Sequence, residues 1–345
     1  MLFNPNQTEF ANDCQRRVWQ YGINIVPLEV SLADIEDEET REACVQIYKY
    51  TMKVLENIWN KPNDYPKVEE FTECWPALYT VDGFRWLFGF NKTVANKCKD
   101  AFALFKQKLP ALGFRYDEAK SEWSNDQYPL FCEYMTRFLA LYKKKKQNMG
   151  DYPERCDFRL FTKRIKFTFD DLLRPLPDAE RARLLELREY ALAKGMKEKM
   201  IEIDYFRYTY KDNISLELDV RIRNDYLPRA MIPYGKLKGV SGFERFLKAA
   251  ENHADAEMLI NYIRNNIFVC DGCKANAASR KKEKDKKICG YYTVNIHGAK
   301  RLSCHVSAIK TVNPNQEDIQ LLKKMMDVRI EQVENYYRIV VDNIH

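Results

Sequence analysis

The feature that most constrains this chain is a cysteine-rich segment at 270–305, which holds four of the ten cysteines in the sequence. It begins with Cys-Asp-Gly-Cys, continues with a lysine-rich spacer and ends after two further cysteines. A Cys-x2-Cys turn presents two thiolates to one zinc ion, and four thiolates complete the zinc tetrahedron without leaving a position open for catalysis. The spacing therefore predicts a structural zinc site with these ligands: Cys270, Cys273, Cys289 and Cys304.

The cysteine-rich segment also allows alternatives to this zinc site. The cysteines could be reduced thiols without metal, or the Cys270/Cys273 pair could be redox-active. His297 could replace one cysteine as a ligand, because it is expected at the tip of a hairpin. His305 follows Cys304 in an expected strand, so the two side chains should point to opposite faces and should not bind one ion together.

The zinc site makes a geometric demand on the hairpin that is expected in the second half of the segment. A three-residue loop would place Cys304 opposite Val294, which leaves Cys289 and Cys304 on opposite faces. A six-residue loop, 295–300, would place Cys304 opposite Tyr291 and bring Cys289 onto the same face as Cys304. The zinc site therefore predicts a wide loop or a bulge.

The composition is that of a folded protein that is long enough for two domains. The 345 residues are 46% hydrophobic and 13% aromatic, with only 12 glycines and 13 prolines. The net charge of +6 permits an anionic partner without demanding one. No apolar run approaches the roughly 20 residues of a membrane span, and residues 1–19 lack the apolar segment of a secretion signal. We expect a cytoplasmic protein with no membrane partner.

Residues 1–150 are expected to form a mainly helical domain with an aromatic hairpin. Ser31 is the expected N-cap of a helix whose first turn is acidic and whose apolar residues recur every three or four positions. The range 71–90 is rich in aromatic residues, and Asp82-Gly83 has the sequence of a hairpin turn. These aromatic residues either pack the core or line a small-molecule pocket. The expected pocket walls are Trp75, Tyr79, Trp86 and Glu73.

Residues 151–345 are expected to form an α+β domain that contains the cysteine-rich segment. The range 158–169 alternates like a strand, and 201–210 and 214–222 alternate around a short turn and predict a hairpin. A helix at about 316–340 has one apolar stripe, which predicts packing on its own domain, with a homodimer contact as the alternative. The fold class is therefore α+β, with a helical N-terminal region, an antiparallel-sheet C-terminal domain, a zinc-stapled hairpin insertion and a long C-terminal helix.

No motif identifies this chain as an enzyme, since it has no phosphate-binding glycine loop, no HExxH and no GxSxG. The spacer RKKEKDKK at 280–287 could contact nucleic-acid phosphates or be a solvated loop. The candidate nucleic-acid contacts are Lys281, Lys282, Lys286 and Lys287. The sequence favours a zinc-containing binding or regulatory protein that contacts nucleic acid through this loop. The alternative is a small-molecule-binding protein that uses the antiparallel sheet and the aromatic cluster.

Overall fold

The structure is a computed structural model that divides into two compact units, Met1–Lys166 (unit 1) and Phe167–His345 (unit 2). The sequence placed the corresponding boundary after residue 150. The structure describes residues 13–65, 75–90, 99–144, 155–163, 165, 167–202, 205–220, 227–234, 242–267, 291–304 and 308–342. These residues confirm an α+β protein with antiparallel sheets and a long C-terminal helix. No helix among them is long and apolar enough to cross a membrane.

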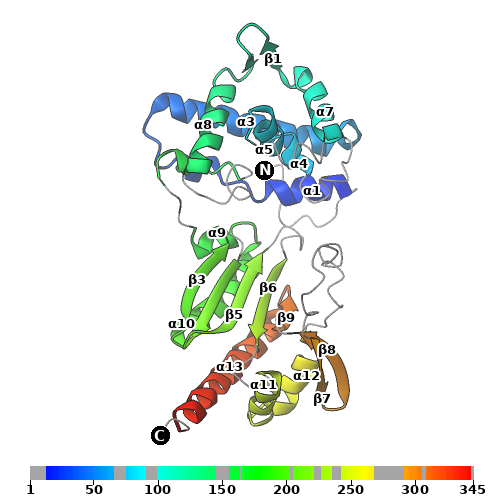
Figure 1. Cartoon of the computed structure of the whole chain (residues 1–345), viewed down its shortest axis with the longest axis vertical. Helices are drawn as coiled ribbons and strands as arrows, with labels where there is room; N and C mark the ends of the chain where they lie inside the picture. The colour runs from blue at the N-terminus through cyan, green and yellow to red at the C-terminus, as the bar shows by residue number, and fades with distance from the viewer. Residues whose placement is uncertain are drawn as a thin grey trace, which may run out of the picture. The chain divides into compact units, whose positions relative to one another are not determined.

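Unit 1 is mainly helical, as the sequence predicts. Its described elements are α1 (Asp13–Gly22), α2 (Leu28–Ser31), α3 (Glu38–Asn60), η1 (Pro62–Asp64), α4 (Trp75–Leu78), α5 (Val81–Leu87), α7 (Lys99–Lys108), η3 (Pro110–Leu112), β1 (Phe114–Asp117), β2 (Glu122–Asn125), α8 (Phe131–Lys144) and η4 (Phe158–Phe161). Helix α3 packs against α1 and α8, and the β1–β2 hairpin contacts α8 (Figure 1).

The long helix α3 is capped by Asp37, not by Ser31. The Asp37 carboxylate accepts a hydrogen bond from the Thr40 backbone N at 2.8 Å, and an acidic first turn follows. Ser31 instead ends α2. Its buried hydroxyl donates to Cys156 O at 2.6 Å and accepts from Phe158 N at 2.7 Å. The expected N-cap is therefore wrong, because this serine makes a long-range contact that its local sequence does not reveal.

The expected aromatic hairpin is wrong for the described part of 71–90, which forms the helices α4 and α5. Asp82 and Gly83 lie inside α5. A Cβ atom on Gly83 would lie 2.1 Å from the Leu78 backbone oxygen and 2.6 Å from the Phe105 ring. The missing side chain of this glycine therefore allows α4 and α7 to approach α5 closely. Glycine is used for close approach as well as for turns, and here it serves the close approach.

Unit 2 is built on a sheet with helices on one of its faces. Its described elements are α9 (Phe169–Leu173), α10 (Asp178–Ala193), β3 (Lys197–Glu202), β4 (Tyr205–Tyr210), β5 (Asn213–Val220), β6 (Pro228–Pro233), α11 (Gly242–Glu251), α12 (Ala256–Asn266), β7 (Tyr291–Ile296), β8 (Ala299–Cys304), β9 (Ala308–Val312) and α13 (Gln316–Asp342). The five-stranded antiparallel sheet has the order β3-β4-β5-β6-β9. Figure 1 shows α10 and α13 behind the strands, and α13 contacts β5 and β6.

The predicted hairpin between 201–210 and 214–222 is confirmed as β4 and β5. Lys211 and Asp212 form its turn, with φ angles of 44° and 61°. Both residues are in the left-handed region, which matches the twist of the flanking strands.

The expected strand at 158–169 is wrong, because this range contains the 3-10 helix η4 and the first residue of α9. Thr168 and Asp171 cap α9 reciprocally, and the Thr168 backbone N donates to Asp171 Oδ2 at 2.8 Å. The capping pair therefore starts a helix where the alternating pattern predicted extended chain.

The long C-terminal helix is confirmed as α13, and its apolar stripe is buried within unit 2. The buried apolar residues of α13 are Ile319, Leu322, Met325, Met326, Val328 and Val333. The homodimer contact through this helix stays a prediction.

Replacement of Gly83 by alanine should destabilise unit 1, although alanine usually favours a helix over glycine by about 1 kcal/mol. The added methyl group would force the Leu78 carbonyl or the Phe105 ring to move, and overpacking of this kind costs about 1–3 kcal/mol. We expect a net loss of up to about 2 kcal/mol in the free energy of unfolding, measured by urea denaturation.

Gly89→Ala is the matched control. Its methyl group would meet nothing within 4 Å, so that only the strain of its φ of 76° remains, at about 1 kcal/mol. Stabilisation of the protein by Gly83→Ala would contradict the close packing at α5.

Candidate functional site

Three of the four predicted zinc ligands lie outside the described residues. These are Cys270, Cys273 and Cys289, whereas Cys304 is the last residue of β8. In the β7–β8 hairpin Cys304 pairs with Tyr291, which is the register that the zinc prediction demands. Within the described ranges, no group of three or more His, Cys, Asp or Glu side chains could hold a metal ion.

The expected wide loop between β7 and β8 is wrong. His297 and Gly298 form a two-residue turn with φ angles of 45° and 87°, and the Gly298 backbone N donates to Asn295 Oδ1 at 3.0 Å. A tight turn with two positive φ angles therefore gives the same register that the prediction assigned to a six-residue loop. The His297 ring lies 3.0 Å from a carboxylate oxygen of Glu251 in α11, so its described partner is an acidic side chain.

The other predicted site residues do not form a described site. The expected pocket residue Glu73 lies outside the described residues. So do the candidate nucleic-acid contacts, Lys281, Lys282, Lys286 and Lys287. Trp75 and Tyr79 are buried in unit 1, with exposed fractions of 1% and 0%. Trp86 stacks on Phe102, with their ring centroids 5.0 Å apart. These three rings therefore contribute to the packing of unit 1.

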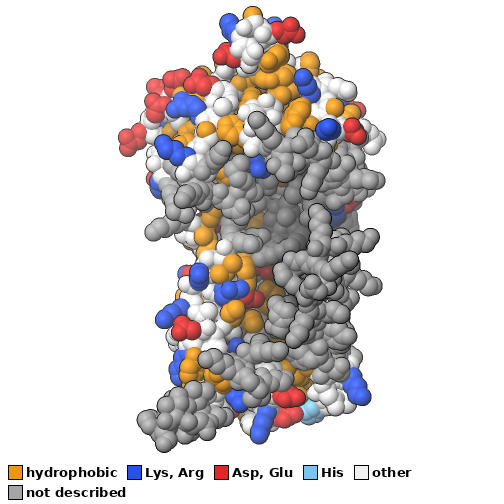
Figure 2. All heavy atoms as spheres, viewed as in Figure 1, with side chains coloured by type: hydrophobic (Ala, Val, Ile, Leu, Met, Phe, Trp, Pro, Cys, Tyr) orange, Lys and Arg blue, Asp and Glu red, His pale blue; other side chains and the backbone are white. Residues whose placement is uncertain are grey.

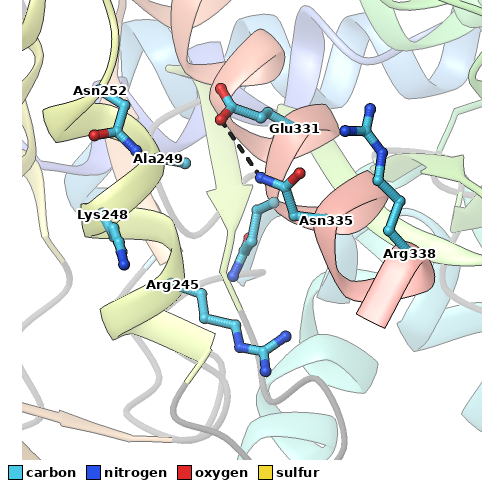
Figure 3. Close-up of a pocket in the computed structure, with 8 residues that line it drawn as sticks. Arg245, Lys248, Ala249, Asn252, Glu331, Asn335 and Arg338 are labelled. Carbon is cyan, nitrogen blue, oxygen red and sulfur yellow. Dashed lines mark hydrogen bonds between the residues drawn. The ribbon is translucent and has the colours of Figure 1, made fainter. Parts of the chain in front are cut away.

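A groove of about 420 Å³ lies between α11 and α13 in unit 2. Figure 3 shows Arg245 and Lys248 on α11, and Glu331, Asn335 and Arg338 on α13. The spacings of three and four residues place the side chains of each helix on one side of it. We call this feature the cationic groove, because three of its side chains are basic and one is acidic.

The basic side chains of the cationic groove are incompletely neutralised. The Arg245 guanidinium lies over the Tyr336 ring, 5.7 Å from its centroid, and makes no ion pair among the described residues. Arg338 is 73% exposed and lies 3.8 Å from Glu334, a distance at which an exposed pair contributes little. The groove therefore retains a positive charge.

A buried arginine is hydrogen-bonded to a residue that lines the groove. Arg329 is 3% exposed, and its Nε donates to Ile214 O at 3.1 Å. Its Nη1 donates to the side-chain oxygen of Gln332, a buried residue that lines the groove. The Gln332 amide in turn donates to Gly242 O at 2.5 Å. Each described partner of this guanidinium is therefore neutral.

Burial lowers the pKa of Arg329 to about 10. Because this pKa lies below that of an exposed arginine, the buried charge costs stability at every pH below about 10, and the cost is relieved only as the pH rises above that value. A pKa lowered this far corresponds to a destabilisation of the charged guanidinium in the folded protein by about 3 kcal/mol. A bound anion nearby would offset the cost at neutral pH.

The sequence had no local signal for this site. The apolar stripe of α13 runs through Met326, Ile330 and Val333 without interruption, so the burial of Arg329 and Gln332 is seen only in the structure. The pairing of α11 with α13, which completes the groove, has no local signal either.

Comparisons with protein-family models, with curated proteins and with solved structures find no match for this chain. The cationic groove is therefore interpreted from its own chemistry. It has basic side chains at its rim, a buried amide in its wall and a guanidinium without a carboxylate partner behind that amide. These features suit an anionic ligand.

Inorganic phosphate should raise the melting temperature of the protein more than chloride does at equal ionic strength. A ligand at about 10 times its dissociation constant adds about 1.4 kcal/mol, which corresponds to roughly 3–6 °C for a unit of this size. The double variant Arg245→Gln/Lys248→Gln should lose most of the shift, as measured by circular dichroism. The control Lys49→Gln/Lys106→Gln removes equal charge from exposed positions of unit 1 and should keep the shift. Equal stabilisation by the two salts would contradict an anion site.

Proposed function

We propose that this chain is a nucleic-acid-binding protein that holds backbone phosphate in the cationic groove of unit 2. The observation that carries the proposal is the buried charge of Arg329, whose described partners are neutral and which reaches the groove through Gln332. A phosphate oxygen in the groove would supply the missing negative charge. Contacts of this kind position a nucleic acid without reading its bases.

A polynucleotide is favoured over a small anion for two reasons. The basic side chains are distributed over two helices, as the separation of Arg245 and Arg338 in Figure 3 illustrates. The basic spacer 280–287 also belongs to unit 2, where it falls between α12 and β7 in the sequence. Several phosphates contacted together give stronger and more salt-dependent binding than one phosphate.

A structural zinc ion at Cys270, Cys273, Cys289 and Cys304 is the second part of the proposal. The Cys-x2-Cys spacing supports it. The pairing of Cys304 with Tyr291 also supports it, because Cys289 precedes Tyr291 by two residues and extended backbone there would bring the two cysteines to one face. Such an ion would tether the basic spacer at both ends. With four thiolate ligands the zinc would have no open position for a substrate, so its role would be structural.

Replacement of Arg245, Lys248 and Arg338 by glutamine should weaken the binding of a labelled single-stranded oligonucleotide. Each lost phosphate contact lowers the slope of log K against log salt by about 0.7. We expect the slope to fall by about 1–2 and the affinity to fall at least about tenfold at low salt. Fluorescence anisotropy over a series of salt concentrations measures both quantities.

The matched control replaces three exposed lysines of unit 1, Lys49, Lys99 and Lys106, by glutamine and so changes the net charge equally. Equal losses of affinity in the two triple variants would mean that the oligonucleotide is attracted by the net charge of the protein, and this result would contradict a role for the groove. A third variant, with glutamine at the four candidate lysines of the spacer, measures the contribution of the spacer separately.

Removal of zinc should increase the number of reactive thiols by four. Burial raises the pKa of Cys14 to about 11 and the pKa values of Cys132 and Cys156 to about 12, so these thiols stay protonated and react slowly at pH 8. Zinc-bound thiolates should also be protected until a chelator removes the metal. A chromogenic disulfide reagent counts the thiols, and elemental analysis counts the zinc.

Cys273→Ser should abolish the bound zinc, whereas the control Cys14→Ser should leave one zinc per chain. A purified protein without zinc, with the same thiol count before and after chelation, would exclude the site.

A further inference from the structure

A row of aromatic and basic side chains begins at the cationic groove and continues past it to the β4–β5 turn. Arg245 of α11 lines the groove and also lies over the Tyr336 ring of α13. Tyr336 contacts Tyr337 edge to face, with ring centroids 5.7 Å apart. The Lys211 ammonium lies 6.0 Å from the Tyr337 centroid and 5.5 Å from the Tyr210 centroid. We call these five side chains the aromatic row.

The two tyrosines that α13 contributes to the aromatic row have exposed surface. Tyr337 is 37% exposed and Tyr336 is half-buried, whereas Tyr208 and Tyr234 of the same unit are fully buried. Figure 2 shows both hydrophobic and basic side chains on the surface of unit 2 at the end where α13 finishes in Figure 1. The α13 rings are therefore available to a ligand, unlike the tyrosines of the core.

The Tyr337 ring is held in position by polar contacts of its hydroxyl. This hydroxyl donates to Lys211 O at 3.0 Å, and Asn213 Nδ2 lies 3.5 Å from it. Lys211 belongs to the tight β4–β5 turn, so the acceptor is fixed by the geometry of the hairpin. A side chain that is ordered before the ligand binds loses little conformational freedom on binding. The ring can therefore act as a preorganised stacking surface.

The unneutralised charge of the aromatic row lies at its groove end. Lys211 is paired with Glu334 at 2.9 Å, and the Tyr210 hydroxyl donates to the same carboxylate at 2.6 Å. Arg245 makes no ion pair with a described residue. Because Arg245 belongs both to the groove and to the row, a site for an anion adjoins a site for a planar group. A nucleotide chain has both groups, since its phosphates are charged and its bases are planar.

We propose that the nucleic acid bound by unit 2 is single-stranded, with unpaired bases that stack on Tyr336 and Tyr337 while the adjoining phosphates lie in the cationic groove. This inference rests on the function proposed above and adds the class of nucleic acid. Stacking of bases on aromatic side chains tolerates any sequence, because every base has a planar face. Such stacking needs unstacked bases, and a duplex offers this surface mainly its phosphates.

A set of three labelled probes separates stacking from phosphate contact. The first is a single-stranded oligonucleotide, the second is a strand of the same length with abasic sites throughout, and the third is the duplex of the first. The abasic strand keeps the phosphates and lacks the bases. We expect fluorescence anisotropy to show that the full chain binds the normal strand at least about fivefold more tightly than the abasic strand, since each stacked base contributes about 1–3 kcal/mol.

Tyr337→Ala should weaken binding of the normal strand about fivefold or more and should leave the affinities for the abasic strand and the duplex unchanged. Tyr337→Phe keeps the ring and should keep most of the affinity. Tyr116→Ala is the matched control, because it removes a ring that is 47% exposed in unit 1 and should change none of the three affinities.

The outcomes distinguish the stacking from the function on which it rests. Equal and salt-dependent binding of the normal and abasic strands would overturn the stacking and leave the groove as a phosphate site. Full binding of the normal strand by a folded Tyr337→Ala variant would also overturn the stacking. Absence of binding of all three probes would overturn both proposals. The comparison of the two strands uses the parent protein, so its result does not depend on the folding of a variant.

Discussion

Unit 2 depends on the burial of one side of α13 against the sheet and against the helices that share its face. Helix α13 contacts β5, β6, α10, α11 and α12, and each large apolar side chain buried in this way contributes about 1.5–3 kcal/mol. Polar contacts along its edges fix its rotation. Lys323 lies 2.5 Å from Glu186 of α10, and the Tyr210 hydroxyl of β4 donates to Glu334 at 2.6 Å. Because the groove residues lie on the same helix, the core that stabilises unit 2 also sets the geometry of the groove.

Arg329 is the point at which stability and the proposed binding of an anion conflict. An apolar side chain of similar volume often stabilises a protein more than a buried charge does, and the neighbours of Arg329 on α13 are largely apolar. A structural role is one reason for the arginine, because its hydrogen bonds join α13 to Ile214 of β5 and, through Gln332, to Gly242 of α11. An electrostatic role is the second, because the charge favours an anion in the groove. The two roles differ in one consequence. Only the electrostatic role predicts that phosphate stabilises the protein.

The sequence predicted elements whose determinants are local and missed those that depend on distant partners. The β4–β5 hairpin and α13 follow from alternation and from helical periodicity. The prediction of a turn at Asp82-Gly83 is wrong because this dipeptide is compatible both with a turn and with a close approach of helices. Only the position of Phe105 in the folded chain distinguishes the two cases. The Thr168/Asp171 capping pair outweighed the alternating pattern only at the end of 158–169, where α9 begins. The cationic groove could not be predicted as a whole, since it needs α11 and α13 to pack side by side.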